Sequence, residues 1–85
     1  MKIVCEIYKS KKQEELYLYV NKTEGLERVP EELLARINCS KPVMSLLLTA
    51  ERTLSRADIK KVMAEIQDNG FYLQLPPSIY QNQQL

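Results

Sequence analysis

Short apolar runs open the chain, and they alternate in the way that is typical of β-strands. Residues 2–8, KIVCEIY, form the first run, and residues 16–20, LYLYV, form the second, with a short charged stretch between them. Two such runs predict an antiparallel hairpin. Because LYLYV is apolar on both of its faces, it is typical of a central strand that two layers cover.

A helix is predicted from Pro30 to about Asn38. Proline suits the first turn of a helix, where its missing N–H would have no partner, and the two glutamates that follow favour the positive end of the helix dipole. The apolar residues recur at helical spacing on one face. They are Val29, Leu33, Leu34 and Ile37.

Residues 43–49, VMSLLLT, form an uncharged apolar run of strand length that begins just after Pro42. A leucine-rich run of this length is also compatible with a helix, but the proline before it favours an extended segment. We interpret the run as a buried strand.

A second helix is expected to begin with a capping-box-like pair, Ser55 and Asp58, and to end at Gly70, which allows a left-handed C-terminal residue. Residues 71–75, FYLQL, then predict a fourth strand with Phe71 and alternate leucines on one face. The prolines that follow, Pro76 and Pro77, forbid further ladder hydrogen bonds and so end the strand.

The element order is therefore strand, strand, helix, strand, helix, strand. It predicts an α/β (α+β) fold with a mixed four-stranded sheet, an N-terminal hairpin and helices packed on the sheet. We expect a single domain over residues 1–77, followed by a flexible or marginally helical tail over residues 78–85.

Composition indicates an ordinary globular protein, since 45% of the 85 residues are apolar and 27% are charged. No apolar run reaches the roughly 20 residues that span a bilayer, and the start lacks the order of regions found in a signal peptide. We expect a cytoplasmic protein without a membrane partner, in which Cys5 and Cys39 are reduced. The net charge of +1 gives no signal for DNA binding.

Three separated motifs resemble the YcgL-domain family of small bacterial proteins. The motifs are CEIYKSKKQEELYLYV, ERVPEELL and GFYLQLPP, and together they reach from Cys5 to Pro77. The sequence departs from the family pattern at Phe71, at residues 38–40 and after Pro77. The resemblance implies an α/β domain of the bacterial cytoplasm with no established biochemical activity. It also implies an association with ribonuclease D and RNA processing, because members are often encoded beside a ribonuclease-D-like exonuclease.

Catalytic chemistry has few candidates, because the chain contains no histidine, the commonest general base and zinc ligand. Two cysteines alone cannot complete a four-ligand zinc site, and neither glycine belongs to a phosphate-binding loop. We therefore expect no metal and no cofactor. Our hypothesis is a non-enzymatic interaction module, monomeric or weakly self-associating, that contacts a protein partner or RNA; the alternative is a small hydrolase or transferase that uses carboxylates or Cys39.

Three groups of residues are binding candidates. An aromatic side chain and three cations surround the hairpin connection, in the combination that holds single-stranded nucleic acid, although lysines there also serve solubility. Tyrosines are expected on one sheet face together with Glu6, either as a recognition groove or as core under a partial cover. Arg28 would hold an anion or pair with Glu24, Glu27 or Glu31. The candidates are Tyr8, Lys9, Lys11, Lys12, Tyr17, Tyr19, Arg28, Tyr72 and Gln74.

Overall fold

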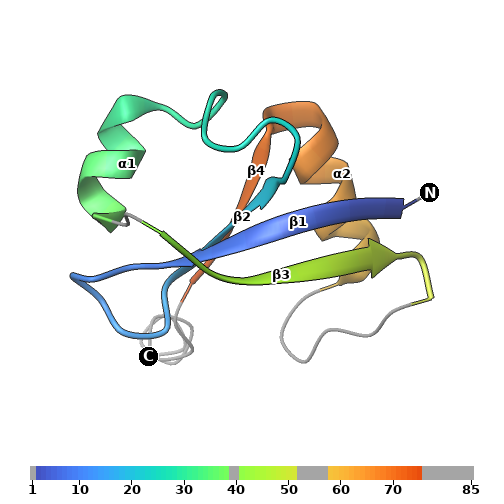
Figure 1. Cartoon of the computed structure of the whole chain (residues 1–85), viewed down its shortest axis with the longest axis horizontal. Coiled ribbons are helices and arrows are strands. Elements are labelled where there is room, and N and C mark those ends of the chain that lie inside the picture. Colours follow the sequence, from blue (N-terminus) through green and yellow to red (C-terminus); the bar gives the residue numbers. More distant parts are fainter. Residues whose placement is uncertain (1, 39–40, 52–57, 76–85) are drawn as a thin grey trace, which may run out of the picture.

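A computed structural model describes residues 2–38, 41–51 and 58–75 of the chain (Figure 1). The predicted order of elements and the α/β class are confirmed. The expectations that concern Cys39, Ser55, Pro76, Pro77 and the tail over residues 78–85 lie outside the described residues. The elements are β1 (Lys2–Lys9), β2 (Tyr17–Asn21), α1 (Glu31–Ile37), β3 (Pro42–Thr49), α2 (Ile59–Asn69) and β4 (Phe71–Gln74).

The four strands form one sheet in the order β3-β1-β2-β4. All three neighbouring pairs are antiparallel, so the expectation of a mixed sheet is wrong. The reason lies in the connections. The segment through α1 does link two strands that run in the same direction, β2 and β3, but β1 lies between them and pairs antiparallel with both.

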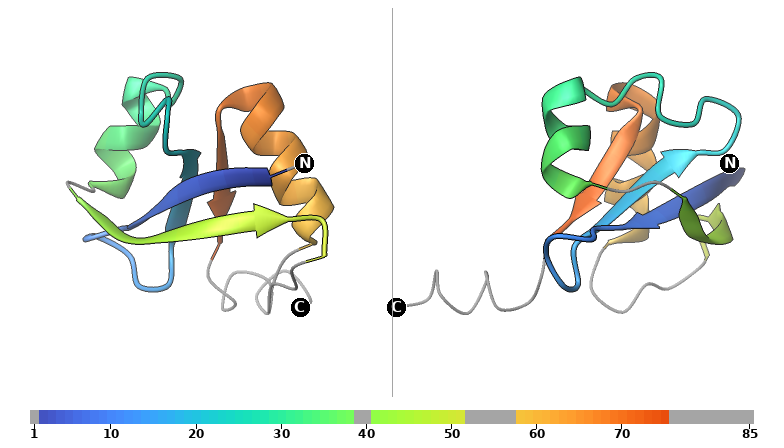
Figure 2. Two further views of the ribbon diagram at one scale, coloured as in Figure 1. Left: turned by 45° about the vertical axis from the view of Figure 1, so that its right-hand side comes forward. Right: turned by 60° about the vertical axis from the view of Figure 1, so that its left-hand side comes forward.

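The two helices cover opposite faces of the sheet, one on either side of β2 and β4 (Figure 2). Each helix packs on its own cluster of buried side chains, and β1 and β2 contribute to both clusters. This arrangement confirms that the LYLYV segment is an interior strand between two layers. The α2 cluster contains Ile3, Cys5, Ile7, Tyr19, Leu48, Val62, Met63 and Ile66. The α1 cluster contains Tyr8, Leu16, Leu18, Val20, Val29 and Ile37.

Local signals account for the ends of both helices. The carboxylate of Asp58 accepts a hydrogen bond of 2.9 Å from the backbone N–H of Lys60, which caps the start of α2. Gly70 ends the helix with φ +89° and donates its N–H to the carbonyl of Ile66. Asn38 has φ 52° and ends α1 in the same left-handed conformation, which asparagine tolerates better than most residues.

β3 differs from the prediction of a buried strand. It lies at an edge of the sheet, and of its eight residues only Leu48 is buried. The uninterrupted apolar run suggested cover on both faces, whereas a run of this kind shows only that a strand lacks charge. Its position in the sheet is set by β1, which pairs with it through most of its length.

Candidate functional site

The tyrosine face of the sheet is partly covered, as we expected. Tyr19 is only 8% exposed and packs in the α2 cluster, where its hydroxyl donates a 2.9 Å hydrogen bond to Oε1 of the buried Gln74. The rings of Tyr19 and Tyr72 meet edge to face, with centroids 5.7 Å apart. Tyr17 and Tyr72 remain partly exposed at the margin of the cluster. Most of this polar and aromatic surface therefore makes internal contacts.

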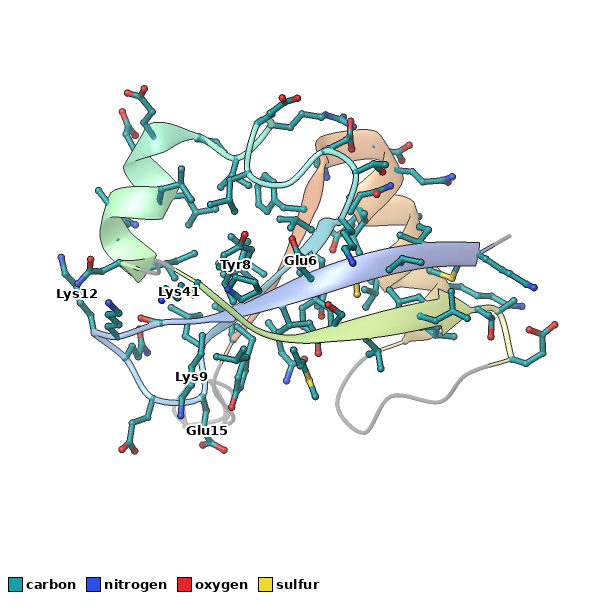
Figure 3. All side chains as sticks on the ribbon, in the orientation of Figure 1. Glu6, Tyr8, Lys9, Lys12, Glu15 and Lys41 are labelled. Carbon is teal, nitrogen blue, oxygen red and sulfur yellow. The ribbon has the colours of Figure 1, made fainter. Side chains whose placement is uncertain are left out.

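Glu6 does not belong to the tyrosine face, and that expectation is wrong. The register of β1 and β2 places Ile7 opposite Tyr19 and Glu6 opposite Val20. Residues that lie opposite each other share a face, so Glu6 lies on the α1 side together with Tyr8 (Figure 3). Alternation predicts which residues within one strand share a face, but which faces of two strands lie together depends on the register, which alternation alone does not give.

Arg28 spans from the loop before α1 to the last turn of α2. Its guanidinium donates to the backbone carbonyls of Gln67 at 3.1 Å and Asp68 at 2.5 Å. The Arg28 side chain is 39% exposed. Its Nη1 atom also lies 3.6 Å from Oε2 of Glu24, so the expected local pair is confirmed. A cation at the C-terminal carbonyls of a helix stabilises its dipole. These contacts give Arg28 a structural role in the described part of the chain.

The hairpin connection is docked on the end of α1. Ser10 is 6% exposed, and its hydroxyl donates a 2.8 Å hydrogen bond to the carbonyl of Ile37. The same oxygen accepts the backbone N–H groups of Lys12 and Gln13, each at 3.1 Å. The backbone N–H of Lys11 donates to the Ile37 carbonyl as well, at 3.2 Å. Ser10 thus orders the turn that carries the lysines.

The predicted lysines lie at the surface of this docked end. Lys9, Lys11 and Lys12 are all exposed, and the ammonium group of Lys12 donates to the carbonyl of Ala35 at 3.3 Å. Arg36, in the last turn of α1, is exposed too. Lys41 extends from the same end of the molecule (Figure 3). We call Lys9, Lys11, Lys12 and Arg36 the basic end.

Tyr8 lies apart from the basic end. Its side chain is 7% exposed and packs in the α1 cluster, so it offers no free ring face for stacking. The aromatic residue beside the lysines is instead Tyr17, which lies directly opposite Lys9 in the register and is partly exposed. Side chains at such opposite positions lie about 5 Å apart at their Cβ atoms. An aromatic ring and a cation therefore adjoin at this end of the sheet.

The described residues show neither a metal-binding cluster nor an unpartnered buried polar side-chain atom. They contain no group of three or more cysteine, aspartate, glutamate or histidine side chains that could hold a metal ion. In the same ranges every buried polar side-chain atom has a hydrogen-bond partner, so none is left pointing toward a ligand. Cys5 is fully buried and Cys39 lies outside the described residues. No helix found there is long and apolar enough to cross a membrane.

One open hollow of about 630 Å³ lies at the far end of the hairpin strands from the basic end. It contains two cations but no carboxylate, so it has no acid and base pair for hydrolysis. Its lining residues are Lys2, Ile3, Val4, Asn21, Lys22 and Thr23.

Two residues that contribute to the basic end are not singled out by any sequence pattern. Ser10 orders its turn, and Arg36 is one of its cations. The local sequence around Ser10 shows only a serine before two lysines, whereas its acceptor, Ile37, lies 27 positions away. Arg36 joins the basic end because α1 ends against the hairpin connection. Only the placement of the helix reveals either role.

The chain matches the YcgL domain over residues 5–77. A YcgL domain-containing protein of Cellvibrio japonicus is 57% identical over 77 residues, which cover 91% of this chain and 79% of that protein. A protein of the same description from Pseudomonas aeruginosa is 51% identical over the same coverage. One from Stutzerimonas stutzeri is 49% identical over 78 residues, or 92% of this chain and 80% of that protein. These matches confirm the resemblance found in the three motifs.

Proposed function

Since the chain belongs to the YcgL-domain family, we propose that it acts in the bacterial cytoplasm as a non-enzymatic interaction module whose basic end contacts the phosphate backbone of single-stranded RNA. The observation that carries the proposal is the docking of the hairpin connection on α1. Ser10 and Ile37 hold two separate segments of the chain as one surface with four exposed cations.

Affinity for a polyanion rises when cations are already positioned, because less side-chain and loop entropy is lost on binding. The hydrogen bonds that the backbone N–H groups of Lys11, Lys12 and Gln13 donate supply that positioning for the residues that follow Ser10. Tyr17, beside Lys9, adds a partly exposed ring on which a base would stack. Two exposed glutamates, Glu14 and Glu15, share the connection and keep the surface only moderately basic, which favours weak and salt-sensitive binding.

The test is a salt series of fluorescence anisotropy with a labelled oligouridine. In the double variant Lys11→Glu with Lys12→Glu we expect binding to weaken by about tenfold or more at low salt, and the slope of log K against log salt to fall by about 1.4, the value for two lost phosphate contacts on a single strand. Circular dichroism first establishes that the variant is folded, and Lys11→Glu alone, which spares the Lys12–Ala35 hydrogen bond, gives a smaller loss in the same direction.

A matched control is available on the other helix. Lys60 and Lys61 are adjacent, exposed lysines of α2, and changing both to glutamate alters the net charge by the same amount. We expect this control to keep most of the affinity. Equal loss in both double variants would reduce the effect to net charge, and an unchanged slope for the Lys11 and Lys12 variant would contradict RNA binding at the basic end.

A protein partner is the second candidate. It is favoured by the apolar side chains that remain exposed on β1 and β3, since soluble monomers seldom expose contiguous apolar surface without binding something. A pull-down from bacterial lysate separates the two candidates. Partners that survive nuclease treatment and are lost when the exposed apolar residues are made charged would support this second function.

A further inference from the structure

The outer edge of β3 is open from Met44 to Thr49, beyond the proline and the irregularity at the start of the strand. The strand is eight residues long, PVMSLLLT, without a charged side chain, and no described segment pairs with its outer side. The opposite edge strand, β4, has only four residues, and the sequence continues into two prolines. Proteins usually blunt strand edges with short strands, charges or prolines, because an open edge pairs with other chains. The two edges of this sheet thus differ in protection.

Exposed apolar side chains gather on the same edge. Among the described residues, every large apolar side chain that is exposed lies on β3 or on β1 next to it. Their exposed fractions are 46% for Val4, 57% for Val43, 54% for Met44 and 44% for Leu47. Val4 and Leu47 are register partners, so part of this surface is continuous across the two strands. Scattered exposed residues need no explanation, but this concentration does.

We propose that β3 pairs antiparallel with β3 of a second copy of this chain, so that two sheets join into one of eight strands. A twofold axis perpendicular to the sheet relates the two copies, and each face of one sheet continues into the same face of the other. A second copy is a fitting occupant because β3 carries no charge, and self-pairing therefore places no like charges opposite each other within the strand.

The register follows from an irregularity of the strand. Met44 pairs with Ile7 but Pro42 pairs with Tyr8, so Val43 is an extra residue in a β-bulge. The regular part of the edge begins at Met44. A twofold axis at Leu46 therefore lets residues 44–48 of one copy pair with the same residues of the other. Met44 then lies opposite Leu48 of the second copy, and Ser45 lies opposite Leu47 of the second copy.

Charges at the two ends of the strand complement each other in this register. Lys41 precedes β3 and Glu51 follows it, and both are exposed. Antiparallel pairing places Lys41 of each copy level with Ala50 of the other, because Val43 is an extra residue, so the ammonium group lies next to the carboxylate of Glu51 at both ends of the joined edge. A parallel arrangement would place the two lysines together and the two glutamates together. The flanking charges therefore favour the antiparallel dimer.

The dimer is expected to be reversible. Edge pairing of one strand buries less surface than the roughly 1,200 Å² that marks the lower end of standard interfaces. Association costs free energy through lost translational and rotational entropy. The backbone hydrogen bonds and the few apolar contacts of the edge outweigh that cost only moderately. We expect a dissociation constant on the order of micromolar.

Sedimentation velocity over a concentration series tests the proposal. The unchanged chain should shift from monomer to dimer as concentration rises. Leu47→Glu should weaken the dimer at least tenfold, because it places two carboxylates near the axis, and Ser45→Lys should weaken it as well. An equimolar mixture of these two variants should dimerise again, since the new glutamate then faces the new lysine. Both residues are exposed in the monomer, so folding should persist.

Ala35→Glu, a new carboxylate on an exposed position of α1, is the matched control and should leave dimerisation unchanged. A chain that stays monomeric throughout the series overturns the proposal, as does a dimer that tolerates Leu47→Glu. Failure of the mixture to associate overturns the register centred on Leu46. These readouts contain no RNA and do not depend on the basic end.

Discussion

Gly70 and Arg28 occupy adjoining space at the end of α2. A Cβ atom placed on Gly70 would lie 2.4 Å from Cβ of Arg28 and 2.9 Å from its Cδ and Nε atoms. The glycine also has φ +89°, in the left-handed region that side chains disfavour. The end of the helix and the passage of Arg28 across it therefore both require the absence of a side chain at position 70.

Gly70→Ala is expected to be among the most destabilising alanine substitutions in the chain. The left-handed backbone costs about 1–2 kcal/mol, and displacement of Arg28 adds about 1–3 kcal/mol of overpacking. Urea denaturation measures the change. The control is Gly25→Ala, because Gly25 has φ +59° but no atom within 4 Å of its Cβ position, so only the backbone cost applies. Equal losses at both glycines would contradict the contact with Arg28.

Arg28→Ala should lower the free energy of unfolding by about 1 kcal/mol, the usual worth of a cation at helix C-terminal carbonyls. Its loss should also speed hydrogen exchange in the last turn of α2, whose carbonyls it binds. Arg28→Lys should recover only part of the stability, because an ammonium group cannot reproduce the two-pronged geometry. Full recovery by lysine would argue for a purely electrostatic role, and Glu24→Ala should have little effect, since that pair is exposed.

Ser10→Ala should destabilise the protein by about 1–3 kcal/mol, because it removes one buried donor and leaves two backbone N–H groups without their acceptor. Thermal denaturation gives the size of the loss. Faster amide exchange at Lys12 and Gln13 would locate it in the hairpin connection. Ser45→Ala, at an exposed position of β3, should change stability little. Unchanged exchange at both amides would show that Ser10 does not order this turn.

Tyr19→Phe should cost about 1–2 kcal/mol, since it removes the buried hydroxyl that donates to Gln74 while keeping the ring in place. The matched substitution Tyr17→Phe, at a partly exposed ring, should cost much less. A double-mutant cycle with Gln74→Leu measures the coupling between the two side chains. Additive losses in that cycle would show that the hydrogen bond contributes nothing to stability.

Much of the fold could be predicted from local pattern. Alternation identified both strands of the hairpin, and the turn chemistry of Gly70 located the end of α2 where the structure has it. Phe71, Leu73 and Leu75 share the α1 side, as their spacing predicted. These features could be predicted because each depends only on residues that are close together in the sequence.

Features set by distant contacts could not be predicted in this way. The face on which Glu6 lies depends on the register between β1 and β2, and the exposure of β3 depends on its place at the sheet edge. The candidate site shows the same division. The lysines were visible in the sequence, but the burial of Tyr8 beneath α1 and the engagement of Arg28 by α2 required the tertiary packing.

The position of the hairpin in the sheet has a consequence for how the chain folds. β1 and β2 are made before β3 and β4 during synthesis, yet they end as the two interior strands, flanked by strands that follow them along the chain. The outer side of β1 has no strand to pair with until β3 has emerged as far as Thr49, and the outer side of β2 has none until β4 has emerged as far as Gln74. The hairpin therefore stays open to association with other chains until β4 pairs with β2, and after that only the outer edge of β3 remains open among the described strands.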